Sequence, residues 1–147
     1  MSIVFVKTAL NYAKDNFSTE IFNQYIKKMS DYSLKIAQTV GGNPIICMTA
    51  SLLHKLADGV SGDFRSNRIN PVLREIGFDT KNIDAINDCI NNLIPENKDK
   101  RKSIEAKVVG DAFILTYSRE INNKDLSIPY LEFEISEKLF HSAEEFN

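Results

Sequence analysis

Residues 44–57 are the most constraining segment of the sequence, because they predict a helix that is apolar over most of its circumference. Asn43 can serve as the N-cap, and Pro44 takes the first helical position, where a proline costs least. The apolar residues of this segment are Ile45, Ile46, Met48, Ala50, Leu52, Leu53 and Leu56. A helix of this kind has to be covered by other elements on most of its sides. The sequence therefore predicts a central helix surrounded by a bundle.

The remaining sequence predicts further helices separated by glycine, proline and asparagine, with no period-two strand of useful length. The other expected helices cover residues 3–14, the segment from Ser18 or Thr19 to Val40, residues 71–76 with Asn70 as the N-cap, residues 81–94, a segment that starts after a Ser103 cap, and residues 131–145. We expect an all-α fold, a single domain over residues 1–147 built as a bundle of about six to seven helices.

The composition is that of an ordinary globular protein, with 43% hydrophobic and 26% charged residues and a net charge of −2. No apolar run approaches the ~20 residues of a membrane helix, and the N-terminal IVFV is too short for a signal peptide, so we expect a cytoplasmic protein with no membrane partner. Cys47 and Cys89 lie among apolar residues and should be reduced and buried. The KDKRK cluster at 98–102 contains and follows acidic residues, which favours a solvated linker over a nucleic-acid-binding patch.

Two polar residues on apolar helices, His54 and Asp111, are the candidates for a functional site. His54 lies at the margin of the apolar face of the central helix. Asp111 follows Ile104 by seven residues and precedes Leu115 by four, so its carboxylate should point inward. An imidazole and a carboxylate on two core helices fit a divalent metal site and fit a structural hydrogen bond. On these residues alone, the structural interpretation is favoured.

Five segments, in this order, resemble the HD-domain superfamily of metal-dependent phosphohydrolases, and most closely its small stand-alone bacterial members. They are YSLKIAQ, MTASLLHKLAD, INPVLREIGF, IDAINDCINNL and SIEAKVVGDAFIL, and the resemblance is strongest over residues 29–118. In the family, the first segment carries a ligand histidine, the second ends in a His-Asp pair and the last holds the final metal-binding aspartate. The resemblance implies an HD-like helical bundle with its site between these helices.

Carried over position by position, the resemblance keeps two of the four metal ligands. The four positions are, in order, Tyr32, His54, Lys55 and Asp111. Histidines that often follow in the fourth segment correspond here to Asn92 and Leu93, and a shift of the first segment by one residue would offer Ser33. An ammonium group close to a metal opposes its binding by several kcal/mol, at an effective dielectric of about 20. We therefore expect no cofactor and no tightly bound metal.

Lys55 stands where the family has the aspartate of its His-Asp pair, and this difference suggests two arrangements of the residues at the family's metal site. In one, the Lys55 ammonium group occupies the vacated metal position and pairs with Asp111, which keeps the buried carboxylate compensated. In the other, Lys55 is a surface residue and Asp111 bonds to His54. The family commonly has a basic residue three positions after its aspartate, whereas here Asp58 follows Lys55, so the two charges are swapped.

A ligand pocket is expected around these positions. Its candidate residues are Tyr32, His54, Lys55, Asp58, Asn92 and Asp111. A phosphate could contact Lys55 and Arg65 at the mouth of this pocket. The polar residues Ser51, Asp63 and Arg65 are explained equally well by the ordinary polarity of loops. His141 lies among acidic residues of the last helix and is expected to be exposed.

The sequence is compatible with three functions. The first is a degenerate HD-like domain without metal-dependent hydrolysis that binds a partner protein or a small phosphorylated ligand. The alternative is a phosphohydrolase acting on a nucleotide or another phosphate ester, with Mn, Mg, Co or Ni held weakly by His54 and Asp111. The third is a structural or oligomerising subunit, and a homo-oligomer is compatible with each of the three.

Overall fold

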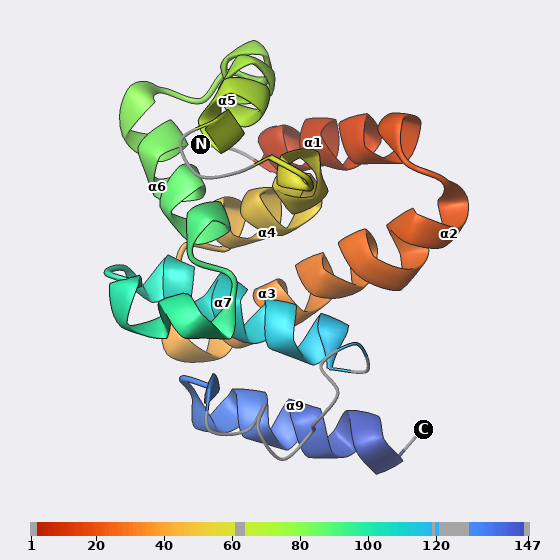
Figure 1. Ribbon diagram of the computed structural model, residues 1–147, viewed down its shortest axis with the longest axis vertical. Coiled ribbons are helices and arrows are strands. Elements are labelled where there is room, and N and C mark those ends of the chain that lie inside the picture. The colour runs from red at the N-terminus through yellow and green to blue at the C-terminus, as the bar shows by residue number, and fades with distance from the viewer. Residues whose placement is uncertain (1–2, 61–63, 119, 121–129, 146–147) are drawn as a thin grey trace.

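The computed structural model describes residues 3–60, 64–118, 120 and 130–145. Its helices are α1 (Ile3–Asn16), α2 (Thr19–Ile21), the π-helix η1 (Phe22–Lys27), α3 (Lys28–Val40), α4 (Pro44–Leu53), the 3-10 helix η2 (His54–Ala57), α5 (Arg65–Ile76), α6 (Thr80–Asn91), the 3-10 helix η4 (Pro95–Lys100), α7 (Ile104–Tyr117) and α9 (Glu134–Glu145). The described residues contain no strand. The predicted all-α bundle is thus confirmed, with α2, η1 and α3 following one another as a single helical segment (Figure 1).

Helix α4 occupies the centre of the bundle, where α1, α3, α6 and α7 pack against it (Figure 1). The Asn43 side chain accepts hydrogen bonds from the backbone N–H groups of Ile45 and Ile46, which satisfies the first turn. The buried residues of α4 are Ile46, Cys47, Thr49, Ala50, Ser51, Leu52 and Leu53. The central apolar helix is therefore confirmed, although its last turn, residues 54–57, is a 3-10 helix.

The segment before α4 begins and ends as its sequence predicts. The Ser18 hydroxyl accepts from the Ile21 N–H, and Gly41 ends α3 in the left-handed conformation with φ 91°. Of the two residues considered for the first ligand position of the family, Ser33 rather than Tyr32 faces inward. Ser33 is fully buried, with its Oγ 2.6 Å from the Oγ of Ser51 on α4, whereas Tyr32 is half-buried.

Helix α5 begins before the predicted cap at Asn70. It starts at Arg65, so Pro71 lies inside the helix and cannot donate a hydrogen bond to the carbonyl of Asn67. Both residues are exposed, so water can replace that bond. Asn70 has a tertiary partner instead of a capping role, since its Oδ1 accepts from the Asn87 side chain on α6 at 2.6 Å.

The charged segment before α7 is exposed at Asp99, Lys100 and Lys102, as its composition predicts, but it also contains a buried arginine. Arg101 is only 4% exposed, and its guanidinium group donates to the backbone carbonyls of Asn92 and Leu93 just after α6. This pairing supplies partners to carbonyl groups that a helix end leaves unsatisfied. Ser103 caps α7 as predicted, with its hydroxyl accepting from the Ala106 N–H.

The C-terminal helix begins later than predicted, and both cysteines are buried as predicted. The last helix begins at Glu134, three residues later than predicted, and His141 on it is exposed as expected. Cys47 and Cys89 are buried free thiols, as predicted, and burial raises the pKa of Cys47 to about 12. Asp63 lies outside the described residues. Among the helices that the structure describes, none has the length and apolar character needed to cross a membrane.

Candidate functional site

His54 begins η2 directly after α4 and is buried, with 3% of its surface exposed. Its Nδ1 atom lies 2.6 Å from the backbone carbonyl oxygen of Ser51, and its Nε2 atom lies 2.7 Å from the hydroxyl oxygen of Tyr117. Burial lowers the pKa of His54 to about 4, so the imidazole is neutral at pH 7. A carbonyl oxygen can only accept, so Nδ1 carries the hydrogen. Nε2 therefore accepts a hydrogen bond from the Tyr117 hydroxyl.

Tyr117 is the centre of an aromatic cluster. Its ring stacks on that of Tyr25 from η1, with centroids 5.0 Å apart and an angle of 13° between the planes. Phe113, one turn earlier on α7, lies 4.6 Å away between centroids. Burial holds the pKa of Tyr117 well above the usual tyrosine range, so the phenol stays protonated.

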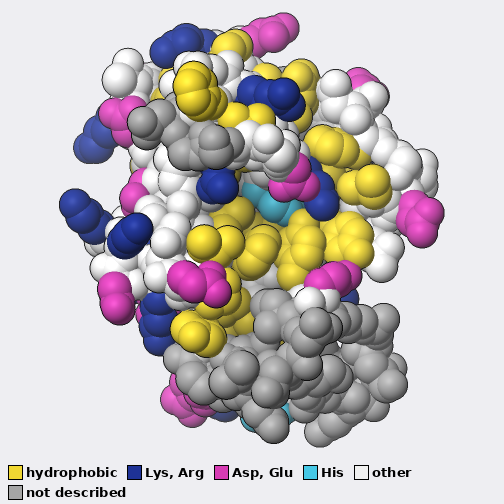
Figure 2. Space-filling model, in the orientation of Figure 1, with side chains coloured by type: hydrophobic (Ala, Val, Ile, Leu, Met, Phe, Trp, Pro, Cys, Tyr) yellow, Lys and Arg dark blue, Asp and Glu magenta, His cyan; other side chains and the backbone are white. Residues whose placement is uncertain are grey.

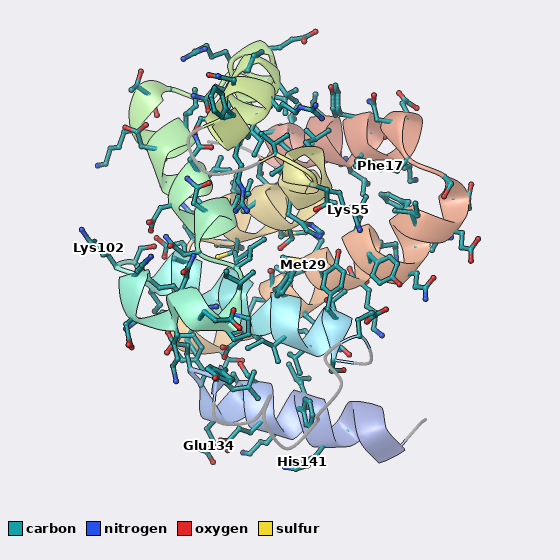
Figure 3. The ribbon with its side chains drawn as sticks, viewed as in Figure 1. Phe17, Met29, Lys55, Lys102, Glu134 and His141 are labelled. Atoms are coloured by element: carbon teal, nitrogen blue, oxygen red, sulfur yellow. The ribbon has the colours of Figure 1, made fainter. Side chains whose placement is uncertain are left out.

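Lys55 extends over this cluster from the end of the central helix (Figure 3). Its ammonium nitrogen lies 4.9 Å from the ring centroid of Tyr25 and 5.5 Å from that of Tyr117, which are cation–π distances. The same nitrogen lies 3.2 Å from Oδ2 of Asp58. The Lys55 side chain is 20% exposed and that of Asp58 62% exposed, so one face of the ion pair is open to water.

A cavity of about 240 Å³ opens at this point, between the end of α4 and helices α6 and α7. Its lining residues are His54, Lys55, Ala57, Asp58, Gly59, Arg65, Ile90, Leu93, Ile94, Phe113 and Tyr117. Figure 2 shows hydrophobic side chains gathered around a histidine in the middle of one face, with charged side chains beside them. Arg65 is held at the cavity by a hydrogen bond from its Nε to the Val60 carbonyl at 3.0 Å. The cavity thus combines an apolar wall with two cationic groups and one carboxylate, that of Asp58.

Asp111 is fully buried, as predicted, but it faces away from this cavity. Its two carboxylate oxygens accept hydrogen bonds from the backbone N–H groups of Glu132, at 2.8 and 3.0 Å, and of Phe133, at 3.2 Å. The ion pair expected with Lys55 and the alternative bond to His54 are both absent, because Asp111 binds the segment that enters α9. Burial raises the pKa of Asp111 to about 6 against the lowering effect of these hydrogen bonds.

The structure brings His54, Lys55 and Asp58 of the predicted pocket together, and places Tyr32 and Asn92 elsewhere. Tyr32 borders a separate hollow over η1 and α3, beside Lys28 and Lys35 among other residues. The Asn92 side chain donates to the carbonyl oxygen and to the carboxylate of Asp88. Leu93, its neighbour, lines the cavity in its place.

These residues do not fit a divalent metal. The two retained family positions have other partners: His54 faces Tyr117 on one side of α7, and Asp111 faces the start of α9. Within the described part of the chain, no group of three His, Cys, Asp or Glu side chains converges where a metal ion could bind. The nearest charged group to Asp58 in the cavity is an ammonium, which repels cations.

The aromatic members of the site were missed by sequence reasoning. Phe113 and Tyr117 are four residues apart on one helix and so share a face, a signal that could have indicated an aromatic pair. Tyr25 is 92 positions before Tyr117, and no local pattern connects the two.

The fold is shared with known structures. Bacillus subtilis YpgQ, crystallised with selenomethionine, superposes with a TM-score of 0.78 at 16% identity, over 97% of this chain and 90% of YpgQ. A second structure, Bacillus subtilis YpgQ in complex with ADP, gives a TM-score of 0.73 at 18% identity over the same shares of the two chains. No protein-family model matches the sequence, and no curated protein matches it significantly. At such identities the likeness establishes the fold alone.

Proposed function

We propose that this chain is a degenerate HD-like domain that binds a small phosphorylated ligand, with a nucleoside diphosphate as the representative ligand, without a resident divalent metal. The observation that carries the proposal is that Lys55 and Arg65 both line one cavity whose wall is apolar and aromatic. A nucleotide has the same two halves, a flat ring system and a charged phosphate chain.

The cationic half of the cavity is suited to phosphate oxygens. Ammonium and guanidinium groups form charge-assisted hydrogen bonds with phosphate, which are stronger than bonds between neutral groups. Lys55 already has a carboxylate partner, but Asp58 is largely exposed and its pairing is therefore weak. A phosphate that also contacts Arg65 can replace Asp58 as the partner of the Lys55 ammonium group, with little loss of free energy.

The apolar half is suited to a ring. Ile90, Leu93 and Phe113 supply wall area for a nucleobase, while the phosphates extend towards the mouth. The structure of YpgQ in complex with ADP supports ADP as the first probe, because YpgQ has the same fold. The order of the five HD-like segments supports the family assignment that is part of the proposal.

The test is a calorimetric titration of the full chain with ADP, first in EDTA and then with Mn²⁺. Binding is expected in EDTA, and Lys55→Gln and Arg65→Gln should each weaken it by roughly tenfold or more. Lys138→Gln is the matched control, because Lys138 lies on α9 in an exposed ion pair with Glu134. Absence of ADP binding, or equal affinity in all four proteins, would contradict the proposal.

A parallel assay of phosphate release with Mn²⁺, Mg²⁺, Co²⁺ or Ni²⁺ separates binding from hydrolysis. The proposal expects no release from ADP or ATP. Metal-stimulated release that Asp111→Asn abolishes would instead support the alternative, a metal-dependent phosphohydrolase.

A further inference from the structure

We infer that the Tyr117 hydroxyl group, oriented by His54, selects ligands that present a hydrogen-bond donor to the cavity, such as the exocyclic amine of adenine. This inference rests on the proposed function and names the part of the ligand that the protein distinguishes. Its basis is the hydrogen-bond polarity along Ser51, His54 and Tyr117.

The polarity of this chain of groups is fixed at its buried end. The Ser51 carbonyl has no hydrogen to give, so Nδ1 of His54 must donate across the 2.6 Å contact. The imidazole is buried and neutral, so Nε2 carries a lone pair. The hydrogen of the Tyr117 hydroxyl group points at that lone pair over 2.7 Å. A ligand therefore meets this hydroxyl group as an acceptor.

The hydroxyl group cannot readily turn to offer its hydrogen elsewhere. Turning it would leave Nε2 of His54 without its partner in a buried position, which is costly. The ring is also held between neighbours, with Tyr25 stacked at 5.0 Å and Phe113 at 4.6 Å. The acceptor is thus preorganised on a rigid element of the cavity wall.

The other polar side chains among the residues that line the cavity do not duplicate this acceptor. Lys55 and Arg65 are donors, and they suit the phosphate end of a ligand. Asp58 is an acceptor, but it lies beside Lys55, at the phosphate end, and its side chain is 62% exposed to water. Tyr117 lies where the two parts of the cavity adjoin, next to Phe113 of the apolar wall and with the Lys55 ammonium nitrogen 5.5 Å from its ring centroid. The edge of a ring on the apolar wall would meet the hydroxyl group there. An amine on that edge fits the site, and a carbonyl oxygen there faces an acceptor.

The experiment compares ADP with purine riboside 5′-diphosphate, which lacks the amine and is otherwise the same shape. The full chain should bind ADP about fivefold or more tightly than the purine analogue, the effect of one hydrogen bond. Tyr117→Phe keeps the ring and should bring the ratio of the two dissociation constants close to one. His54→Leu should also reduce the ratio, because the freed hydroxyl group can then turn. Tyr32→Phe, outside the cavity, should keep the wild-type ratio.

The outcomes separate the two proposals. If neither nucleotide binds, the proposed function fails and this inference fails with it. If both bind the wild type equally, or if Tyr117→Phe keeps the preference for ADP, this inference is wrong while the proposed function stands. A purely structural role for Tyr117 would weaken both ligands equally and leave the ratio unchanged, which also contradicts the inference. Tyr117→Phe decides the matter if His54→Leu does not fold.

Discussion

The guanidinium group of Arg101 lies directly against the Cα atom of Gly110, with no room for a side chain between them. A Cβ atom at residue 110 would overlap the guanidinium carbon and two of its nitrogens, and Arg101 is held in place by the carbonyls of Asn92 and Leu93. Gly110→Ala should therefore lower the free energy of unfolding by roughly 2 kcal/mol or more, although alanine favours helix. Urea denaturation followed by circular dichroism measures this loss.

The same measurement in an Arg101→Ala background provides the control. There the added methyl group meets no guanidinium group, so most of the cost of Gly110→Ala should disappear. A stability of Gly110→Ala within about 0.5 kcal/mol of wild type would contradict the packing of these two residues.

Asp111 anchors the segment that leads into α9, and its replacement by Asn should loosen that segment. The carboxylate accepts from two backbone N–H groups, and an Asn side chain can turn only one oxygen towards them. Asp111→Asn should cost about 2 kcal/mol in urea denaturation. Asp31→Asn is the control, because Asp31 lies in an exposed ion pair with Lys27 and should change stability little. Equal effects of the two changes would rule out the anchoring role.

The two stacked tyrosines offer a matched pair of hydroxyl deletions. Tyr117→Phe leaves Nε2 of His54 without its partner in the core and should cost about 1–2 kcal/mol. Tyr25→Phe removes a hydrogen bond to Glu120, which is exposed to water, and should cost less than about 0.5 kcal/mol. Both variants keep the stacked rings, so thermal denaturation compares the hydroxyl groups alone. A larger loss for Tyr25→Phe would contradict the buried bond.

Acidification should destabilise the protein through His54. Its pKa of about 4 in the folded chain lies below the ordinary value of about 6.5, so the unfolded chain binds the extra proton in this range. Its stabilising contribution is present above pH 6.5 and is lost as the pH falls towards 4, by roughly 3 kcal/mol in all.

The raised pKa of Asp111 acts in the opposite direction over an overlapping range, because its folded form takes up a proton first. Asp111 is present in both wild type and His54→Leu, so its contribution cancels in the difference between their unfolding free energies. The unfolding free energy of the wild type, relative to that of His54→Leu, should decrease as the pH falls. A difference that stays constant from pH 7 to pH 4.5 would show that His54 titrates normally.

The sequence by itself determined the helical class and the position of the centre. The apolar circumference of residues 44–57, the caps at Asn43 and Ser103, and the end of α3 at Gly41 are local signals, and each is present in the structure. Local signals failed where a side chain had a tertiary partner. Asn70 resembles a cap but binds Asn87, and Arg101 resembles a linker residue but closes the end of α6.

In the candidate site, too, some residues could be predicted from local sequence and others depended on tertiary contacts. His54, Lys55 and Asp58 lie within five residues at the end of the central helix, and Arg65 begins the next helix, α5; all four line one cavity. The sequence also placed Asp111 correctly in the core, because its helical spacing fixes an inward direction.

Only the tertiary structure decided which neighbour each inward side chain meets. The inward face of α7 is wide enough to contact several helices, so Tyr117 reaches His54 at the end of α4, while Asp111, less than two turns earlier, reaches the start of α9. Helical spacing tells that a residue is buried, and the packing of distant segments determines its partner. For that reason the His54–Asp111 pair, which the sequence suggests, is replaced in the folded protein by His54 and Tyr117.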